Sequence, residues 1–260
     1  EADPVLALNA HSTLRAMSAT KSGAEPFTDA HRAHYAPAAI AAEKRPDVLA
    51  RLIERELTEP LVRRNNSLAK YANHTGFIPN GDEQENAILQ LASAPHGQRV
   101  RLALASALPH LSPTMRTLVA QHLLRYDQDA TDHNLPLLVW TGIRELPLSE
   151  LANCAHVCRI PQVTKLIARR LAEASDKQPG PLNELLAEAA EMPDGQAEIV
   201  AGLAEGLKGW RKAPKPADWD KFVASLSPTE TAALGTVRKL NVLFGDGVAL
   251  EEIRRIALDD

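Results

Sequence analysis

Apolar residues recur at helical spacing along most of the chain, and this pattern constrains the fold more than any other feature. Segments of roughly 10–17 residues, a common length for globular helices, follow one another with short polar turns between them. No segment alternates apolar and polar residues over a useful length, so no sheet is expected. The chain is therefore predicted to be all-α. One such face comprises Met115, Leu118, Val119, Leu123 and Tyr126.

Proline and capping residues mark where these helices are expected to begin. Pro136, Pro147 and Pro161 each stand near the start of an apolar run, where a missing N–H removes no helical hydrogen bond. Ser227-Pro228-Thr229-Glu230 has the form of a capping box with proline at its first helical position, and it predicts a helix that ends at Gly245. The stretch from Lys177 to Pro181 is expected to be a break between helices.

Short turns between such helices predict stacked antiparallel pairs. The pair spacing is near the ~40-residue period of helical repeats, although the pairs are dissimilar in sequence. The predicted architecture is an α-α superhelix, an irregular HEAT-like solenoid. A low aromatic content of 4% suits closely stacked helices rich in Leu and Ala. We predict one HEAT-like domain over residues 1–260, with any internal break near 209–217, where the sequence RKAPKP is the most linker-like.

The stretch from Asp127 to Leu146 joins two predicted helices and carries the densest group of short polar side chains. Such side chains favour caps and turns, and a helix N-terminus also suits an anion. We predict a structural or interaction hub here, with Trp140 as an anchor in the core. Its residues are Asp132, His133, Asn134 and Trp140.

The sequence contains no nucleotide-binding glycine loop, no Gly-x-Ser-x-Gly elbow and no His-Glu-x-x-His motif, so it is predicted not to be an enzyme. An alternative is a metal-dependent hydrolase in which His31 and His34, one helical turn apart, ligate a metal near Asp29. A third ligand is not evident. Cys154 and Cys158 are expected to be free buried thiols, because two cysteines on one face of a helix do not suit a disulfide. His156 would face away from both on that helix, so the three are not expected to share a metal ion.

Nucleic-acid binding is a second alternative. Its candidate surface is a basic and aromatic patch, for which a solvated loop is the simpler interpretation. The net charge of −4 shows no basic excess, so no nucleic-acid partner is expected. The patch would comprise Lys208, Arg211, Lys212, Lys215, Trp210 and Trp219.

Two groups of motifs resemble known families. Asp3-Pro4-Val5 and the segment from Gln98 to Ala105 (QRVRLALA) resemble HEAT repeats, which commonly carry Asp-Pro near a turn and Val-Arg ahead of an alanine-rich helix. A second set resembles the helical-repeat region of large planctomycete-type haem-binding proteins of the membrane-bound dehydrogenase type. That set is Leu104 to Leu108 (LASAL), Asp132 to Leu138 (DHNLPLL) with Trp140, Ile160-Pro161, and Phe244-Gly245-Asp246.

This second resemblance implies a place within a larger redox protein. In that family a sugar-dehydrogenase-like propeller precedes the helical region and a cytochrome c domain follows it. The chain has no Cys-x-x-Cys-His, so any haem belongs to a neighbouring domain, and no cofactor, catalytic or haem-ligating residue is assigned here. The resemblance implies a spacer that contacts other proteins or neighbouring domains, in a periplasmic or membrane-associated location.

The start at Glu1 without Met suggests a processed or excised chain, and no apolar run approaches the ~18–20 residues needed to cross a bilayer. Direct membrane insertion is therefore not expected.

Overall fold

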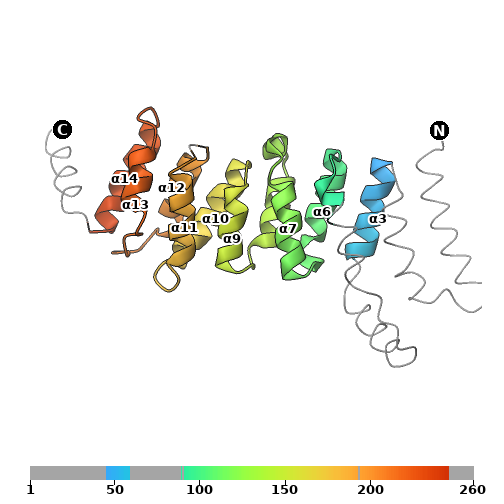
Figure 1. Cartoon of the computed structure of the whole chain (residues 1–260), viewed down its shortest axis with the longest axis horizontal. Helices are drawn as coiled ribbons and strands as arrows, with labels where there is room; N and C mark the ends of the chain where they lie inside the picture. The colour runs from blue at the N-terminus through green and yellow to red at the C-terminus, as the bar shows by residue number, and fades with distance from the viewer. Residues whose placement is uncertain (1–44, 59–88, 90, 193, 246–260) are drawn as a thin grey trace, which may run out of the picture. The chain divides into compact units, whose positions relative to one another are not determined.

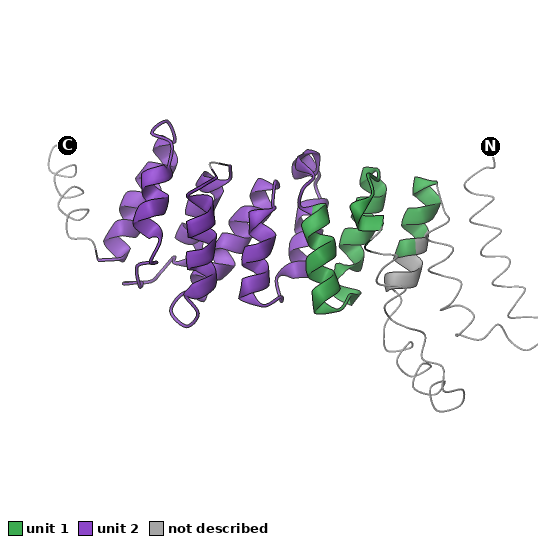
Figure 2. Ribbon diagram, viewed as in Figure 1, with its two compact units in different colours: residues 1–123 green, residues 124–260 purple. Residues whose placement is uncertain are grey.

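The structure, a computed structural model, describes residues 45–58, 89, 91–192 and 194–245. All regular structure in these residues is α-helix or 3-10 helix, so the all-α prediction is confirmed for this part of the chain. The prediction for His31 and His34 and the HEAT-like motif Asp3-Pro4-Val5 fall outside these residues. The backbone divides into two compact units, residues 1–123 (unit 1) and 124–260 (unit 2), coloured separately in Figure 2.

Unit 1 is built on the packing of its first two described helices. Val48, Leu49 and Ile53 are buried on the first of them, and Val100 and Leu104 are buried on the second. The Arg99 guanidinium lies 2.5 Å from the Asp47 carboxylate at the exposed edge of this pair. The elements are α3 (Pro46–Thr58), α6 (Gln98–Ala107), η1 (Leu108–His110) and α7 (Pro113–Leu123), with α3 against α6 and α6 against α7.

Two details of unit 1 differ from the sequence expectation. The apolar spacing of Val100, Leu104, Leu108 and Leu111 predicts one helix from Gly97 to Leu111, but α6 ends at Ala107 and a 3-10 turn follows. Pro109 explains the change, because it has no N–H with which to continue the α-helical ladder. Leu118, predicted to face inward on α7, is 36% exposed.

Unit 2 contains a short 3-10 helix and then a succession of α-helices with brief connections (Figure 1). Its buried residues are mainly Leu, Ile, Val and Ala, as the composition predicted. The elements are η2 (Asp127–Thr131), α8 (Leu135–Ile143), α9 (Leu148–His156), α10 (Pro161–Glu173), α11 (Gly180–Ala189), α12 (Gln196–Gly206), α13 (Trp219–Ser225) and α14 (Thr231–Leu243).

The helices of unit 2 alternate between two rows. In one row α8 contacts α10, α10 contacts α12 and α12 contacts α14, while in the other α9 contacts α11 and α11 contacts α13. The rows meet where α10 contacts α9 and α11. The main contacts of each helix are therefore with helices one or two places away along the chain.

The junction between α10 and α12 in unit 2 is close, because two glycines on α12 face α10. A Cβ atom placed on Gly206 would lie 2.5 Å from the Arg169 carbonyl oxygen and 2.9 Å from the Ala172 Cβ. Gly202 meets Lys165 and Ala168 in the same way, one turn earlier. Glycine at these two positions lets the helix backbones approach more closely than any side chain would allow.

Most proline-based helix starts are confirmed. Pro136 and Pro161 lie in the first turns of α8 and α10, and Pro147 directly precedes α9. The break predicted from Lys177 to Pro181 is shorter than expected, because α11 begins at Gly180 with Pro181 in its first turn.

The capping box predicted at Ser227 is wrong. The Ser227 hydroxyl shares a 2.8 Å hydrogen bond with the Thr229 hydroxyl, and α14 begins only at Thr231, after Glu230. The Glu230 N–H donates to the Ser227 carbonyl, which makes this segment a turn that precedes the helix. Gly245, at the predicted end of the helix, has φ +85°, a value that glycine adopts without strain.

The linker-like stretch near 209–217 lies inside unit 2 and is tied to two helices. The Ala213 N–H donates to the Leu243 carbonyl at 3.1 Å, and the Ala217 N–H donates to the Asn183 side-chain oxygen at 2.9 Å. The division between the two units instead falls after Leu123. Whether the chain behaves as a single domain stays a prediction.

Candidate functional site

The predicted hub of polar residues begins unit 2. The η2 turn buries Asp129 completely, and the chain then reaches Asp132. One carboxylate oxygen of Asp132 accepts hydrogen bonds from the N–H groups of Asn134 and Leu135, at 2.8 and 2.7 Å. The Leu135 N–H begins the first turn of α8 and the Asn134 N–H directly precedes it, and free N–H groups at a helix start need acceptors. Asp132 is therefore the side chain that caps α8.

The same contacts set the charge state of the capping carboxyl. The hydrogen bond from Leu135 and then that from Asn134 lower the pKa of Asp132, and nearby His133 contributes a smaller effect in the same direction. Hydrogen bonds to the ionised form stabilise it against protonation. A negative charge also interacts favourably with the N-terminal end of the α8 dipole.

The other predicted hub residues do not converge on this carboxylate. His133 and Asn134 are exposed, and the Asn134 side chain makes no capping hydrogen bond although its backbone precedes α8. Trp140, predicted to be an anchor in the core, is only half-buried in the second turn of α8, and Leu137 one turn earlier is 47% exposed. The geometry gives Asp132 a capping function, and binding of a partner by the group stays a prediction.

The cysteines are free, and neither is suited to nucleophilic chemistry. Burial raises the pKa of Cys154 to about 12 and also raises the pKa of Cys158. Only the thiolate is an effective nucleophile or metal ligand. Because α9 ends at His156, Cys158 follows the helix and does not share a face with Cys154. Its thiol donates to the Ile160 carbonyl at 3.4 Å.

In the part of the chain that the structure describes, no group of three His, Cys, Asp or Glu residues is arranged to hold a metal ion. His156 lies 3.0 Å from the Glu188 carboxylate and links α9 to α11.

Of the two tryptophans in the predicted basic and aromatic patch, Trp219 does not lie on the surface. Trp219 is fully buried, and its indole N–H donates to the Asn241 side-chain oxygen at 2.6 Å. Its ring packs edge-on against Phe244, with the ring centroids 5.1 Å apart. The alternative of a base-stacking surface is therefore wrong for Trp219, because this residue joins α13 to α14 in the core. Lys215 from the same patch is paired with Asp220 at 2.7 Å.

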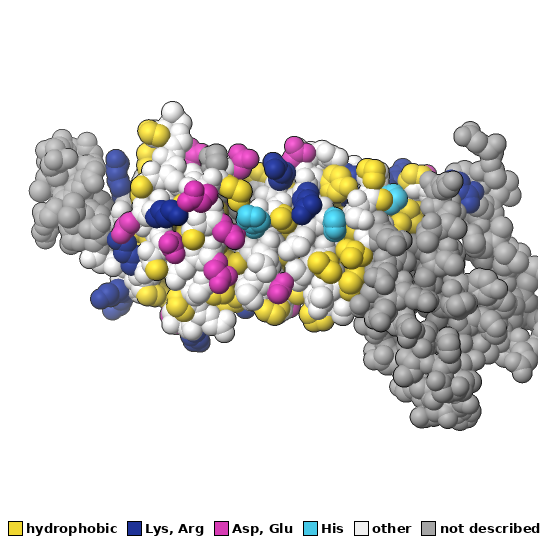
Figure 3. All heavy atoms as spheres, in the orientation of Figure 1, with side chains coloured by type: hydrophobic (Ala, Val, Ile, Leu, Met, Phe, Trp, Pro, Cys, Tyr) yellow, Lys and Arg dark blue, Asp and Glu magenta, His cyan; other side chains and the backbone are white. Residues whose placement is uncertain are grey.

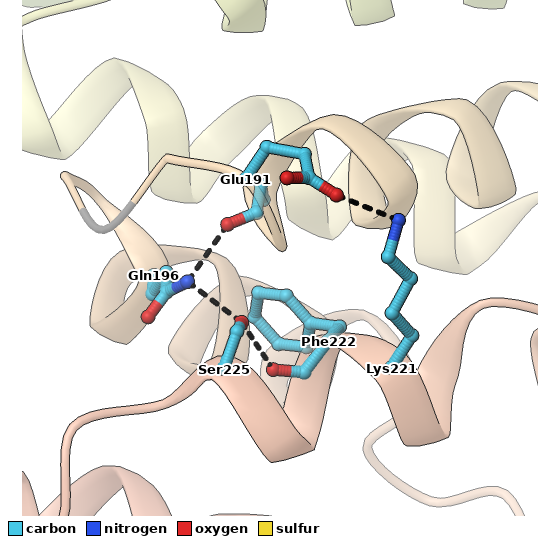
Figure 4. Close-up of polar contacts among 6 residues, drawn as sticks. Glu191, Gln196, Lys221, Phe222 and Ser225 are labelled. Atoms are coloured by element: carbon cyan, nitrogen blue, oxygen red, sulfur yellow. Dashed lines mark hydrogen bonds and ion pairs between the residues drawn. The ribbon is translucent and has the colours of Figure 1, made fainter.

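A buried polar cluster that the sequence analysis missed joins α11, α12 and α13 (Figure 4). Gln196 is 3% exposed, and its side-chain amide donates to the Ala189 carbonyl at 2.7 Å and to the Ser225 hydroxyl at 3.0 Å. The Ser225 hydroxyl donates in turn to the Phe222 carbonyl at 2.7 Å. The sequence does not indicate this cluster, because Gln196 stands at a helix start and its partners lie on two other helices.

The exposed side of α11 and the turn that follows it carry a second feature that the sequence analysis missed. Glu184, Glu188 and Glu191 follow one another at helical spacing, and all three are exposed. Lys221 on α13 donates to Glu191 at 2.8 Å and lowers the pKa of that carboxyl (Figure 4). The spacing of the three glutamates is visible in the sequence, but the charged groups that they meet depend on which helices lie beside α11.

No known family model matches the chain, and no curated protein or solved structure matches it. In the described ranges, no helix combines the length and the apolar character that crossing a bilayer requires. The geometry of these residues is therefore the basis for any functional assignment.

Proposed function

We propose that the chain is a non-catalytic helical-repeat scaffold that binds other proteins or neighbouring domains, with its helices forming an irregular HEAT-like α-α superhelix. The main support is the contact pattern of unit 2, in which each helix packs on helices one or two places away. Helical-repeat proteins are built in this way, and they use long surfaces with distributed contacts for binding.

The chemistry of the described residues supports a binding rather than a catalytic function. The polar hub uses Asp132 to cap α8, and burial raises the pKa of both thiols. The hub residues His133 and Asn134, together with half-buried Trp140, remain the proposed contact points of the hub.

Small-angle X-ray scattering of the whole chain tests the proposed architecture. A compact domain of this length would have a radius of gyration of about 18 Å. A superhelix of helix pairs is extended and should give a clearly larger value. A value near that of a compact sphere would contradict the superhelix.

The family resemblance extends this proposal to a spacer between a dehydrogenase-like domain and a haem domain of a larger redox protein. The test is to replace the segment with a flexible linker in such a protein and to measure electron transfer between the flanking domains. Slower transfer is expected, because a flexible linker no longer holds the two centres at a fixed separation. Unchanged transfer would remove the spacer function but not the architecture.

A further inference from the structure

The turn that joins α12 to α13 carries a group of unpaired cations. Lys208, Arg211 and Lys212 are exposed, and none of them has an ion-pair partner in the described ranges. The sequence has no Asp or Glu from residue 206 to 217, so positive charge is in excess here. In Figure 3, lysine and arginine side chains gather at the end of unit 2 that carries α13 and α14. The lysines of unit 2 that do pair with a carboxylate are Lys165, Lys215 and Lys221.

Trp210 stands between these cations, and its side chain is half-buried. Its indole N–H has no hydrogen-bond partner among the residues that the structure describes, whereas the indole N–H of Trp219 donates to Asn241. A half-exposed indole with a free N–H suits a boundary that is apolar on one side and wet on the other. The dipole of α12 favours a cation only within the last turn of the helix, so it does not explain Arg211 and Lys212.

The turn is held in place by the helices that it joins. Its Gly209 has φ +87°, a value that glycine adopts without strain. The Trp210 N–H donates to the Leu207 carbonyl at 3.1 Å. The Ala213 N–H donates to the Leu243 carbonyl, also at 3.1 Å, and the Leu207 and Ala213 side chains are buried. The cations and the indole are therefore presented on an ordered backbone, and a ligand that binds them has little loop ordering to impose.

We propose that residues 208–212, the Trp210 turn, are a contact surface for the anionic head groups of a lipid bilayer. The cations meet the lipid phosphates, and the indole lies at the head-group level, where tryptophan is enriched in membrane proteins. The net charge of −4 does not prevent this contact, because charges more than about 10 Å from the bilayer are screened at about 0.1 M salt. The inference goes beyond the proposed scaffold function and does not depend on the superhelix.

Two other anionic partners use the turn less completely. Single-stranded nucleic acid binds to platforms on which successive bases stack, and the turn offers one exposed ring, since Trp219 is in the core. An acidic peptide would use the cations but leaves the half-exposed indole with its free N–H unexplained. A bilayer surface uses both the charge and the amphipathic ring.

Co-sedimentation of the full chain with lipid vesicles tests the proposal. One set of vesicles is phosphatidylcholine alone, and the other is an equal mixture of phosphatidylcholine and phosphatidylglycerol. Each lysine or arginine near an anionic surface strengthens binding about fivefold, so the three cations should favour the mixed vesicles by about 100-fold. Equal binding to the two sets of vesicles, or no binding to either, would overturn the proposal.

Matched variants locate the contact. The test variant combines Lys208→Gln, Arg211→Gln and Lys212→Gln, and it should lose most of the preference for the mixed vesicles. The control should stay within about twofold of the wild type, and equal weakening of both variants would show attraction by total charge alone and contradict the proposal. A single-stranded oligonucleotide or a polyglutamate peptide that binds the turn more tightly than the vesicles do would also contradict it. The control replaces three exposed arginines that precede α10: Arg51→Gln, Arg125→Gln and Arg159→Gln.

Quenching of tryptophan fluorescence by brominated lipids gives a second readout that does not change the charge. Bromine atoms near the head groups should quench the emission of the wild type, and Trp210→Phe should remove most of this quenching. Trp140→Phe is the matched control, because Trp140 is also half-buried, and it should leave the quenching in place. Quenching that persists in Trp210→Phe would show that another part of the chain meets the bilayer.

Discussion

Gly202 of α12 lies directly over Ala168 of α10, and a Cβ atom at Gly202 would be 2.8 Å from the Ala168 Cβ. That separation is much shorter than any normal carbon–carbon contact, and the Lys165 carbonyl approaches the same position. Backbone atoms cannot move aside as a flexible side chain can. The spacing of these two helices therefore depends on the absence of a side chain at this residue.

The substitution Gly202→Ala is expected to destabilise unit 2 by about 1–3 kcal/mol, as for overpacking in other cores. The free energy of unfolding from urea denaturation measures the effect. The matched control is Gly235→Ala on α14, where an added Cβ meets nothing within 4 Å. The control should stabilise the protein by about 0.5–1 kcal/mol, because alanine is the better helix former. Destabilisation of similar size in both variants would contradict the close α10–α12 contact.

Removing the α8 cap by Asp132→Ala is expected to cost about 1 kcal/mol at neutral pH, the usual value for a lost N-terminal cap. Asp132→Asn is the control, because it keeps a side-chain oxygen for the Asn134 and Leu135 N–H groups. Thermal or urea unfolding measures both variants.

The pH dependence of these variants follows from the lowered pKa of Asp132. A carboxyl whose pKa is lower in the folded state stabilises the fold above its unfolded value of about 3.9 and loses that contribution as the pH falls through the folded value. The stability difference between the wild type and Asp132→Asn should therefore disappear in acid. A difference that is constant across the acidic range would show that the charge of Asp132 has no effect.

Replacing Gln196 with methionine keeps a long side chain but removes its two donated hydrogen bonds. The Ala189 carbonyl would lose this partner, and we expect a loss of about 1–3 kcal/mol in the free energy of unfolding. Ser225→Ala removes only the hydroxyl and should cost less, because the Ala189 bond remains. A larger effect from the serine substitution would show that the cluster is organised around Ser225 instead.

The substitution Trp219→Phe keeps an aromatic ring in the core but removes the indole N–H that donates to Asn241. A loss of about 1–3 kcal/mol is expected from the unpaired amide oxygen and the smaller ring. Trp210→Phe is the control, since Trp210 is only half-buried. Iodide quenching of fluorescence gives a second check: removing Trp219 should raise the quenched fraction of the remaining emission, because Trp219 is the most protected of the three tryptophans.

The helical class and most helix starts could be predicted because they depend on local sequence. Pro136 and Pro161 restrict their own backbone, so their positions in the first turns of α8 and α10 followed from residue type alone. Ser227-Pro228-Thr229-Glu230 was misleading because the Ser227 hydroxyl bonds within the turn instead of to the helix. A short polar side chain can do either, and the sequence does not distinguish the two.

The contacts between helices could not be predicted in the same way. Gly202 and Gly206 lie in an alanine-rich helix, and their importance depends on the Lys165 and Arg169 carbonyls of α10. The alternative of a basic and aromatic patch included Trp219 because lysines lie near it in sequence, whereas its contacts are with Phe222, Phe244 and Asn241. Capping at Asp132 was predictable, because it involves only the residues that follow directly.

The neighbour-to-neighbour contacts of unit 2 also have a kinetic consequence. Because the main contacts join segments that are close in sequence, little loop-closure entropy is lost before the first favourable contacts form. Folding can nucleate at any adjacent pair of helices and propagate to the neighbouring helices in both directions. Fraying should begin at the ends of the array and stop at the α10–α12 junction, which hydrogen exchange would then identify as the slowest region to open.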